Sequence, residues 1–297
     1  IRLMIKACII APIDFSPPHC RINDEIGILK KNKYDVKLLL ASSSLKLESY
    51  EKNDNFEIFR IFYSGILSWK LPILNSIFMT LCLFFKAREI DAKIYHCHDY
   101  QTSHVAYLLS LSGKKVIYDI GDDSPSNHRT YFRLRVSKSF FLGKFIENSI
   151  RYLEGVIMKK CDITFSLSQT MKEDRINFTE KIKVLKYSPN YNTKTINEKN
   201  LKNSNRVIYQ GALSEDKGLF SIFKAIYVVS KFNKKIELVI AGYMPDNSWH
   251  KIKSKYSKEW LEKHITFLGF LDYRKIEEEI SKSFLGLCIL KPFSYSY

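Results

Sequence analysis

Two histidines lie in one short segment of the sequence, Ile94–His98, and an aspartate follows it directly. The histidines are His96 and His98, and Asp99 follows them. Alternate residues of a strand face the same side, so the two imidazoles are expected to point one way and Cys97 the other. Imidazole and carboxylate groups together can carry protons. A metal site is disfavoured because no further histidine cluster supplies the remaining ligands. Packing of one histidine and a loop hydrogen bond for the other would explain the pair about as well.

The next apolar segment, residues 115–119, ends in a group of carboxylates. They are Asp119, Asp122 and Asp123. Crowded carboxylates raise one another's pKa, and such groups serve in acid–base chemistry or bind a hydroxyl-rich ligand. For Asp123 the better interpretation is the N-cap of a helix.

A third feature is the segment from Tyr209 to Leu219, which predicts a strand, a loop and the start of a helix. Gly211 follows the strand, and Lys217 and Gly218 open the helix. Backbone amides at a helix N-terminus and a nearby lysine converge on an anion, so this segment is typical of a diphosphate site. It is neither a Walker loop nor the G-x-G-x-x-G fingerprint, which disfavours a nucleotide kinase or a dehydrogenase.

These residues lie among short apolar runs that alternate with amphipathic segments, and this alternation predicts parallel sheets covered on both faces by helices. The polar stretch near residue 190 has the composition of a linker. We therefore predict two Rossmann-like domains, 1–189 and 206–297, joined by a linker, 190–205. The expected strands are 6–11, 36–41, 58–63, 94–98, 115–119, 163–167, 182–185, 206–210, 236–241, 265–267 and 285–290. The expected helices are 21–32, 74–88, 103–110, 169–177, 218–231, 250–263 and 274–281, with one long amphipathic stretch over 131–160.

The net charge, the cysteine spacing and the apolar runs of the chain limit its possible partners and its cellular environment. Its 297 residues carry a net charge of +16, which favours anionic partners such as phosphorylated substrates, acidic membranes or nucleic acid. An abundance of surface lysine explains much of this excess, but Arg129–Lys160 is a concentrated basic stretch. The six scattered cysteines predict neither a zinc site nor a disulfide framework and fit a reducing cytosol. The longest apolar run, Leu71–Phe85, falls short of the ~20 residues that span a bilayer.

Taken in order, these segments resemble glycosyltransferase family 4, the retaining enzymes of the GT-B fold. The resemblance covers nearly the whole chain, and no single motif decides it. The matching segments are Pro17-Pro18-His19-Cys20-Arg21 with Asp24-Glu25, Tyr34-Asp35-Val36, His96-x-His98-Asp99 with Thr102, Tyr118-Asp119-x-Gly121-Asp122, Cys161–Ser168, Gln210-Gly211 through Lys217-Gly218, Leu238–Gly242 and Ile265–Gly269.

This resemblance implies a hexosyltransferase-like enzyme that uses a nucleotide-diphosphate sugar as co-substrate and needs no metal or other cofactor. The acceptor would be a cell-surface glycan, such as lipopolysaccharide or capsule, or a lipid-linked precursor. The implied catalytic residues are His98, Asp99, Asp119 and Asp122. The implied diphosphate-binding residues are Gly211, Lys217 and Gly218, and those for the nucleotide are Gly242, Gly269 and Phe270.

The sequence departs from the family pattern in three places. Gly121 stands where many members have a histidine, and Ala212 stands where many have an arginine that helps to neutralise the diphosphate. The sequence ends at Tyr297, before the family's pair of glutamates that hold the donor. We therefore expect the second domain to be incomplete and the activity of this chain to depend on residues beyond it.

Two other function classes compete with an enzyme. A degenerate or truncated homologue could bind glycans or a partner protein without catalysis, and the three departures favour it. A nucleic-acid-binding protein is disfavoured because no RRM, KH or helix-turn-helix pattern is present. The resemblance implies a cytoplasmic protein, peripheral on the inner face of the cell membrane, where the basic stretch could meet anionic lipid.

Overall fold

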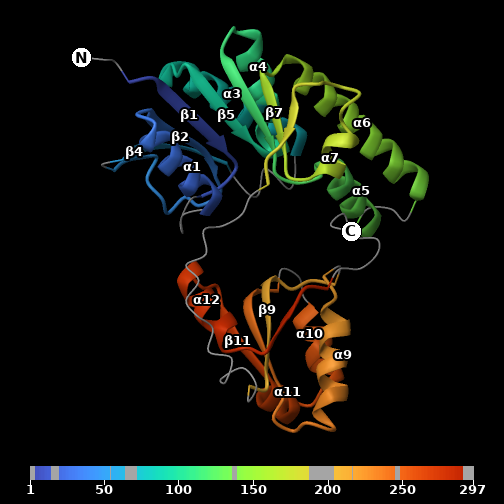
Figure 1. Cartoon of the computed structure of the whole chain (residues 1–297). Helices are drawn as coiled ribbons and strands as arrows, with labels where there is room; N and C mark the ends of the chain where they lie inside the picture. The colour runs from blue at the N-terminus through green and yellow to red at the C-terminus, as the bar shows by residue number, and fades with distance from the viewer. Residues whose placement is uncertain are drawn as a thin grey trace. The chain divides into compact units, whose positions relative to one another are not determined.

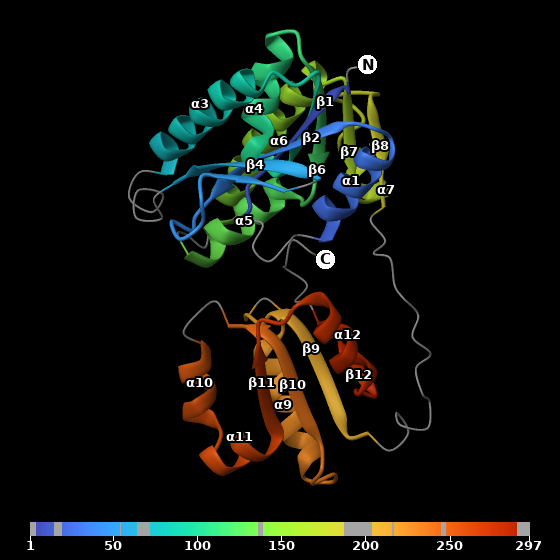
Figure 2. The same ribbon diagram turned by 90° about the vertical axis from the view of Figure 1, so that its left-hand side faces the viewer.

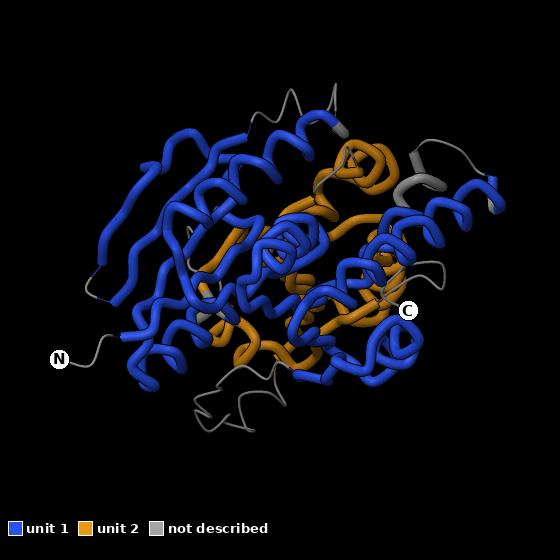
Figure 3. The backbone as a smooth tube through the Cα atoms, turned by 90° about the horizontal axis from the view of Figure 1, so that it is seen from above, with its two compact units in different colours: residues 1–190 blue, residues 191–297 orange. Residues whose placement is uncertain are grey.

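The computed structural model describes residues 4–14, 20–53, 55–63, 72–135, 139–186, 204–215, 217–244 and 248–289. These residues form two compact units, Ile1–Asn190 and Tyr191–Tyr297 (Figure 3). The expected motif residues Pro17, Pro18 and His19, most of the expected linker, and the end of the chain from Leu290 lie outside the described residues.

The first unit is an eight-stranded sheet with helices on both faces (Figure 1). The strand order is β3-β4-β2-β1-β5-β6-β7-β8, and only β3 runs antiparallel to its neighbour. The strands are β1 (Lys6–Ala11), β2 (Asp35–Ser42), β3 (Tyr50–Lys52), β4 (Phe56–Phe62), β5 (Ile94–His98), β6 (Lys115–Ile120), β7 (Ile163–Ser166) and β8 (Ile182–Val184). The helices are α1 (Cys20–Lys31), α3 (Pro72–Ile90), α4 (Asp99–Leu111), α5 (Ser124–Arg135), α6 (Phe140–Lys160) and α7 (Gln169–Glu173).

Side chains that alternate along the strands build two cores, one on each face of this sheet. Ile9, Leu38 and Leu40 pack with Ile22 and Ile26 of α1. Cys8, Ile10, Leu39 and Cys97 pack on the other face in the larger core, to which α3, α4 and α6 contribute. Helix α4 contacts both α3 and α6, so these three helices form one layer (Figure 2). Helix α1 lies on the opposite face.

The second unit is a four-stranded parallel sheet in the order β11-β10-β9-β12. Its core consists of apolar residues from β9, β10 and helices α9 to α11. The strands are β9 (Arg206–Ala212), β10 (Glu237–Tyr243), β11 (Ile265–Gly269) and β12 (Leu285–Leu287). The helices are α9 (Leu219–Ser230), α10 (Ser248–Lys255), α11 (Lys258–His264) and α12 (Tyr273–Ser281).

The predicted alternation of strands and helices is confirmed, but several details were wrong. Strand β3, antiparallel to β4, was not expected, and the helix expected over 169–177 ends at Glu173. The amphipathic stretch 131–160 belongs to two helices, α5 and α6, and Ser139 caps α6 by accepting a hydrogen bond from the Leu142 amide. Residues 250–263 likewise divide into α10 and α11 at Ser257, which caps α11. Helix α4 begins at Asp99 rather than at Ser103. In the described part of the chain, no helix is long and apolar enough to cross a bilayer.

Candidate active site

The candidate site of the first unit lies where the strand order reverses direction. Strand β1 pairs with β2 on one side and with β5 on the other, all parallel. In open parallel sheets a ligand binds at such a point, beyond the carboxyl ends of the strands. Strands β5 and β6 end here in His98 and Ile120, and α1 begins near this edge.

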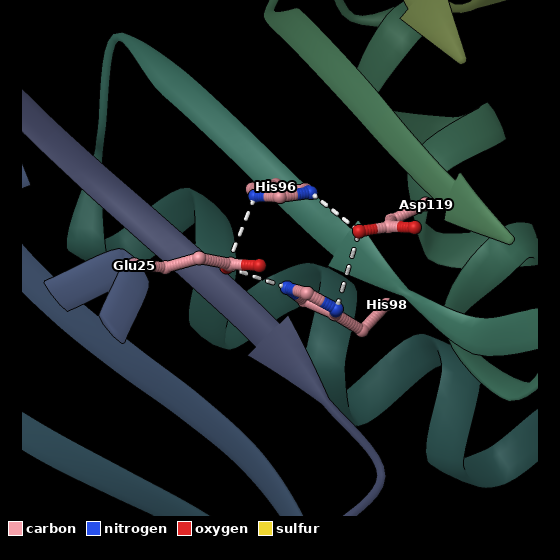
Figure 4. A group of neighbouring side chains, drawn as sticks. All are labelled: Glu25, His96, His98 and Asp119. Carbon is pink, nitrogen blue, oxygen red and sulfur yellow. Dashed lines mark hydrogen bonds and ion pairs between the residues drawn. The ribbon is translucent and has the colours of Figure 1, made fainter. Parts of the chain in front are cut away.

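Four side chains meet at this edge in a closed ring (Figure 4). Each of the two imidazoles lies between Glu25 and Asp119. The Nε2 and Nδ1 atoms of His98 lie 2.9 Å from Glu25 Oε2 and 3.7 Å from Asp119 Oδ2. The Nδ1 atom of His96 lies 3.4 Å from Glu25 Oε2, and its Nε2 atom lies 3.4 Å from Asp119 Oδ2. As predicted, the imidazoles share one face of β5, with ring centroids 4.3 Å apart, and Cys97 is buried in the opposite core.

Arg21 compensates the charge of both carboxylates. Its guanidinium donates a hydrogen bond to Asp119 Oδ2, and its Nε lies 3.5 Å from Glu25 Oε1. Burial alone would raise the pKa of Asp119, but contacts with the two imidazoles and Arg21 hold it below its ordinary value. The pKa of Glu25 is lowered against the same cost of burial by His98 and His96. Both carboxylates are therefore stabilised as anions by Arg21 and by contacts with the two imidazoles.

The expectation that crowding raises the pKa of these aspartates was wrong for Asp119 and Asp123. Burial also raises the pKa of Asp123, but the hydrogen bonds from Ser126 and from the guanidinium of Arg175 outweigh burial, so the pKa is lowered overall. Arg175 is fully buried; it donates to Asp123 at 2.7 Å and to Glu154 at 2.8 Å. Opposite charge from distant segments thus outweighs repulsion between sequence neighbours.

Three of the four predicted catalytic residues line one cavity of about 220 Å³. His98, Asp99 and Asp122 face it together with Arg21. Asp119 is fully buried and takes part in the ring described above rather than lining the cavity. The cavity is thus bordered by carboxylates, an imidazole and a guanidinium, a set of groups that can hydrogen-bond several hydroxyls of a sugar.

Asp99 lines this cavity in an unusual backbone conformation. Its φ of 65° lies in the left-handed region, where a non-glycine residue is strained. Thr102 supports the turn by donating a hydrogen bond of 2.5 Å to the His98 carbonyl. A Cβ at Gly121 would overlap the Asp99 carboxylate, so the missing side chain at position 121 leaves room for Asp99. Burial raises the pKa of Asp99, and the charges of Asp122 and Asp119 raise it further against the opposing effect of His98.

A second cavity, of about 320 Å³, opens on the side of α3 and α4. It has an apolar floor that includes Ala41, Met79 and Leu83, and polar groups that include Asn75 and Thr102. Pro12 lines this cavity, whereas Ala11 and Ile13 line the smaller one. The two cavities therefore lie on either side of the chain that leaves β1.

The candidate site of the second unit consists mainly of backbone. Gly211, Gly242 and Gly269 lie at the carboxyl ends of β9, β10 and β11, which are neighbours in the sheet. All three have positive φ. Gly211 and Gly242 pack so closely that a Cβ on Gly242 would overlap the Gly211 backbone. This packing exposes main chain at the sheet edge, where amides can approach a ligand. Phe270, which follows Gly269, is 72% exposed.

Helix α9 begins at the same edge, at the point where this sheet also reverses its strand order. Gly218 is its N-cap with φ of 76° and gives no side-chain cap. Lys217 precedes it and is half-buried. The predicted diphosphate residues Gly211, Lys217 and Gly218 therefore all belong to one strand–loop–helix connection, within which Asp216 lies outside the described residues. The N-terminus of a twelve-residue helix and an ammonium group favour an anion there.

The sequence interpretation considered His96 beside His98 but missed Arg21 and Glu25 as site residues. The available signal was their spacing, since Arg21 and Glu25 stand four apart on the helix that follows the first strand. Together, Glu25, His96, His98 and Asp119 present possible metal ligands within 4.8 Å of one another, a donor set that could hold zinc. Arg21 already places a positive charge against both carboxylates.

Each unit has the doubly wound architecture, and the whole chain has the GT-B fold. Residues 192–289 match the family described as "Glycosyl transferases group 1". No match was found among curated protein sequences.

Solved structures with this fold include enzymes that act on sugars. Sucrose-phosphate synthase from Thermosynechococcus elongatus is 11% identical with a TM-score of 0.67, over 94% of this chain and 74% of that one. A structure described as trehalose-6-phosphate from E. coli bound with UDP-2-fluoro glucose is 12% identical with a TM-score of 0.63, over 96% and 78%. The catalytic domain of starch synthase IV from Arabidopsis thaliana, bound to ADP and acarbose, is 11% identical with a TM-score of 0.62, over 95% and 77%.

The family match in the second unit and the fold together support a glycosyltransferase enzyme. They do not favour the alternative of a non-catalytic glycan-binding protein. The identities are low enough that the residue roles rest on the geometry of this chain.

Proposed function

We propose that the protein transfers a hexose from a nucleotide-diphosphate sugar to a hydroxyl of a cell-surface glycan, such as lipopolysaccharide or capsule, or of its lipid-linked precursor, with retention at the anomeric carbon, as in glycosyltransferase family 4. The observation that carries this proposal is the glycine-lined edge of the second unit, where α9 begins without a side-chain cap and Lys217 precedes its N-cap, Gly218. That edge lies within the residues that match the glycosyltransferase family.

The donor would bind by its diphosphate at the N-terminus of α9. Lys217 and the first amides of the helix would stabilise the negative charge that grows on the leaving diphosphate, and such stabilisation is a large part of catalysis. Gly242, Gly269 and the exposed Phe270 would take the nucleotide, the glycines by backbone contact and Phe270 by stacking on the base. In this proposal no metal ion is needed, because lysine and helix supply the positive charge.

The acceptor side of the reaction would lie in the first unit. Asp99, Asp122 and His98 line the 220 Å³ cavity and would bind sugar hydroxyls, since carboxylates accept from them and imidazole can donate or accept. Asp119 would act from beneath, by holding Arg21 and the imidazoles in place. The acceptor oxygen would bond to the anomeric carbon while the bond from that carbon to the phosphate oxygen breaks. The acceptor proton would then pass to the departing phosphate.

Calorimetry with UDP, ADP and GDP tests the donor site without requiring turnover. At least one of the three nucleotides should bind, and Lys217→Ala should weaken that binding by about 1.5–3 kcal/mol, roughly ten- to a hundredfold, because a charge-assisted contact is lost. Lys224→Ala is the matched control, since Lys224 is exposed on the same helix further from its N-terminus. Equal affinity for the wild type and Lys217→Ala would exclude this site.

We further propose that the protein works in the cytoplasm on the inner face of the cell membrane. The support is the basic stretch Arg129–Lys160, whose helix α6 leaves Lys144, Lys159 and Lys160 exposed. Clustered basic groups are attracted to anionic headgroups, an attraction that salt weakens. Binding to anionic but not neutral vesicles, lost at high salt, is the expected result. Equal binding to both would contradict the electrostatic part.

A further inference from the structure

Helix α3 carries an apolar stripe on its outer face as well as on its buried face. Met79, Leu83, Ala87 and Ile90 are buried in the core beneath it. Five further large apolar side chains are between 43% and 64% exposed: Leu74, Ile77, Phe78, Leu81 and Phe85. Their spacing of three and four residues places them along one side of the helix. Solvent-exposed helices are normally polar on this side, so a contiguous apolar stripe indicates an interaction surface.

Helix α6 presents a second stripe of the same kind. Phe141, Phe145 and Tyr152 are more than 60% exposed and share one side of the helix by their spacing. Leu142 and Leu153 are exposed beside them. Because α3 and α6 both contact α4, they lie in one layer on the same face of the sheet (Figure 2).

The exposed charged side chains of α6 are all basic. Both acidic residues of α6 are buried: Glu147 pairs with Arg129, Lys144 and Arg151, and Glu154 pairs with Arg175. Helix α4 contains no charged residue after Asp99.

At the end of α3, the exposed acids Glu89 and Asp91 pair with Lys86 and Lys114. On α6, by contrast, the exposed surface combines aromatic and aliphatic groups with lysine and contains no acidic side chain, because Glu147 and Glu154 are both buried.

We propose that the outer face of α3, together with that of α6, docks on a lipid bilayer that contains anionic lipids. Aromatic and aliphatic side chains enter the boundary between headgroups and acyl chains, and lysines meet the anionic headgroups. The occupant is a membrane because the face combines apolar stripes with an excess of positive charge: α6 exposes lysines and no acid, and the exposed acid of α3, Glu89, is paired with Lys86. This inference rests on the membrane part of the proposed function and names the surface that makes the contact.

Docking through α3 would also bring one wall of the 320 Å³ cavity to the membrane surface. Asn75, Ser76, Met79 and Leu83, all on α3, line that cavity. Its apolar floor and polar groups suit an acceptor that has both a lipid part and a sugar part. A lipid-linked acceptor could therefore reach this cavity from the bilayer in which it is anchored.

Vesicle cosedimentation tests the inference, with phosphatidylcholine vesicles and with equimolar phosphatidylcholine and phosphatidylglycerol. The test variant is Phe78→Ser/Leu81→Ser, whose sites are exposed, so the variant should fold, which circular dichroism checks. Its affinity for the mixed vesicles should fall about tenfold or more because two inserting apolar groups are lost. The control is Ile28→Ser, an exposed site on α1 on the opposite face of the sheet, and it should bind like the wild type.

Three results would overturn the inference, and each has a different meaning. Wild-type affinity in Phe78→Ser/Leu81→Ser would show that α3 does not make the contact, while leaving the membrane location intact. No binding of the wild type to either vesicle would remove both the α3 contact and the membrane location. A dimer in sedimentation velocity that this variant abolishes would assign the face to a second copy of the chain. Nucleotide calorimetry reports on the donor site separately in every case.

Discussion

The two units carry their candidate sites at equivalent places in similar sheets, but one site consists of charged side chains and the other mainly of backbone. The first unit fills its carboxyl edge with charged side chains that are buried or half-buried, including Asp119, Glu25 and Arg21. The second unit leaves its edge almost without side chains, since Gly211 and Gly242 pack backbone to backbone there. The first arrangement suits a neutral ligand with many hydroxyls, and the second suits an anion that amides and one lysine can surround.

This contrast also predicts which substitutions should destabilise each unit. In the first unit, removal of one partner leaves a buried charge uncompensated, which is costly in a low-dielectric interior. In the second unit, the sensitive feature is the main chain, because a single methyl group would force two strands apart. The predictions below run from the largest expected effect to the smallest.

Arg175→Met should destabilise the first unit the most, by about 3–5 kcal/mol, because the fully buried Glu154 would lose its cationic partner. Hydrogen exchange in urea, read on peptides from residues 1–190, measures this loss separately from the second unit. The double variant Arg175→Met/Glu154→Gln should recover part of the stability. The exposed site Lys183→Ala serves as the control. A loss below about 1 kcal/mol would show that the buried pair contributes little.

Gly242→Ala should destabilise the second unit by about 1–3 kcal/mol, because its φ of 150° and its contact with Gly211 both exclude a Cβ. Nucleotide binding should be lost with it. Gly286→Ala is the matched control, since a Cβ at Gly286 meets no atom within 4 Å. Similar unfolding of the two variants would show that the glycine contact at the sheet edge is not needed.

The carboxylates of the first site should make that unit sensitive to acid. The folded pKa of Glu25 is lowered, so its contribution is complete above its unfolded pKa of about 4.3 and is lost as pH falls through the folded value. Glu25→Gln should therefore flatten the acid limb of the unfolding curve by about 1 kcal/mol between roughly pH 5 and pH 2. Glu48→Gln, at an exposed site, should leave that limb unchanged. An acid limb of wild-type slope in Glu25→Gln would contradict the prediction.

Asp99 should show the opposite sign and the smallest effect. Its folded pKa is raised, so ionisation of Asp99 costs stability as pH rises from its unfolded value of about 3.9 through the folded value. Asp99→Asn removes that cost and should stabilise the first unit at neutral pH by less than about 1 kcal/mol, while the proposed function predicts a loss of sugar transfer. The difference between the urea midpoints of the variant and the wild type at pH 7 and pH 4 measures the effect. A less stable variant at neutral pH would contradict it.

The sequence by itself determined the features that depend on neighbouring residues. The apolar periodicity predicted the parallel strands and most helices, and the alternation along β5 placed His96 and His98 on one side. The segment with Gly211, Lys217 and Gly218 predicted the strand–loop–helix connection of the second unit. Each of these inferences uses residues only a few positions apart, which share one strand, one turn or one helix end.

Only the tertiary structure decided which partners the charged groups have and in which direction their pKa values shift. Asp119 contacts Arg21 from 98 positions away, and this contact together with the imidazoles reverses the pKa shift that crowding alone predicts. The fit of Asp99 into the space left by Gly121, and the exposure of one face of α3, are likewise invisible to local pattern. Solvation and charge depend on which distant segments cover a residue, and packing of the whole unit sets that.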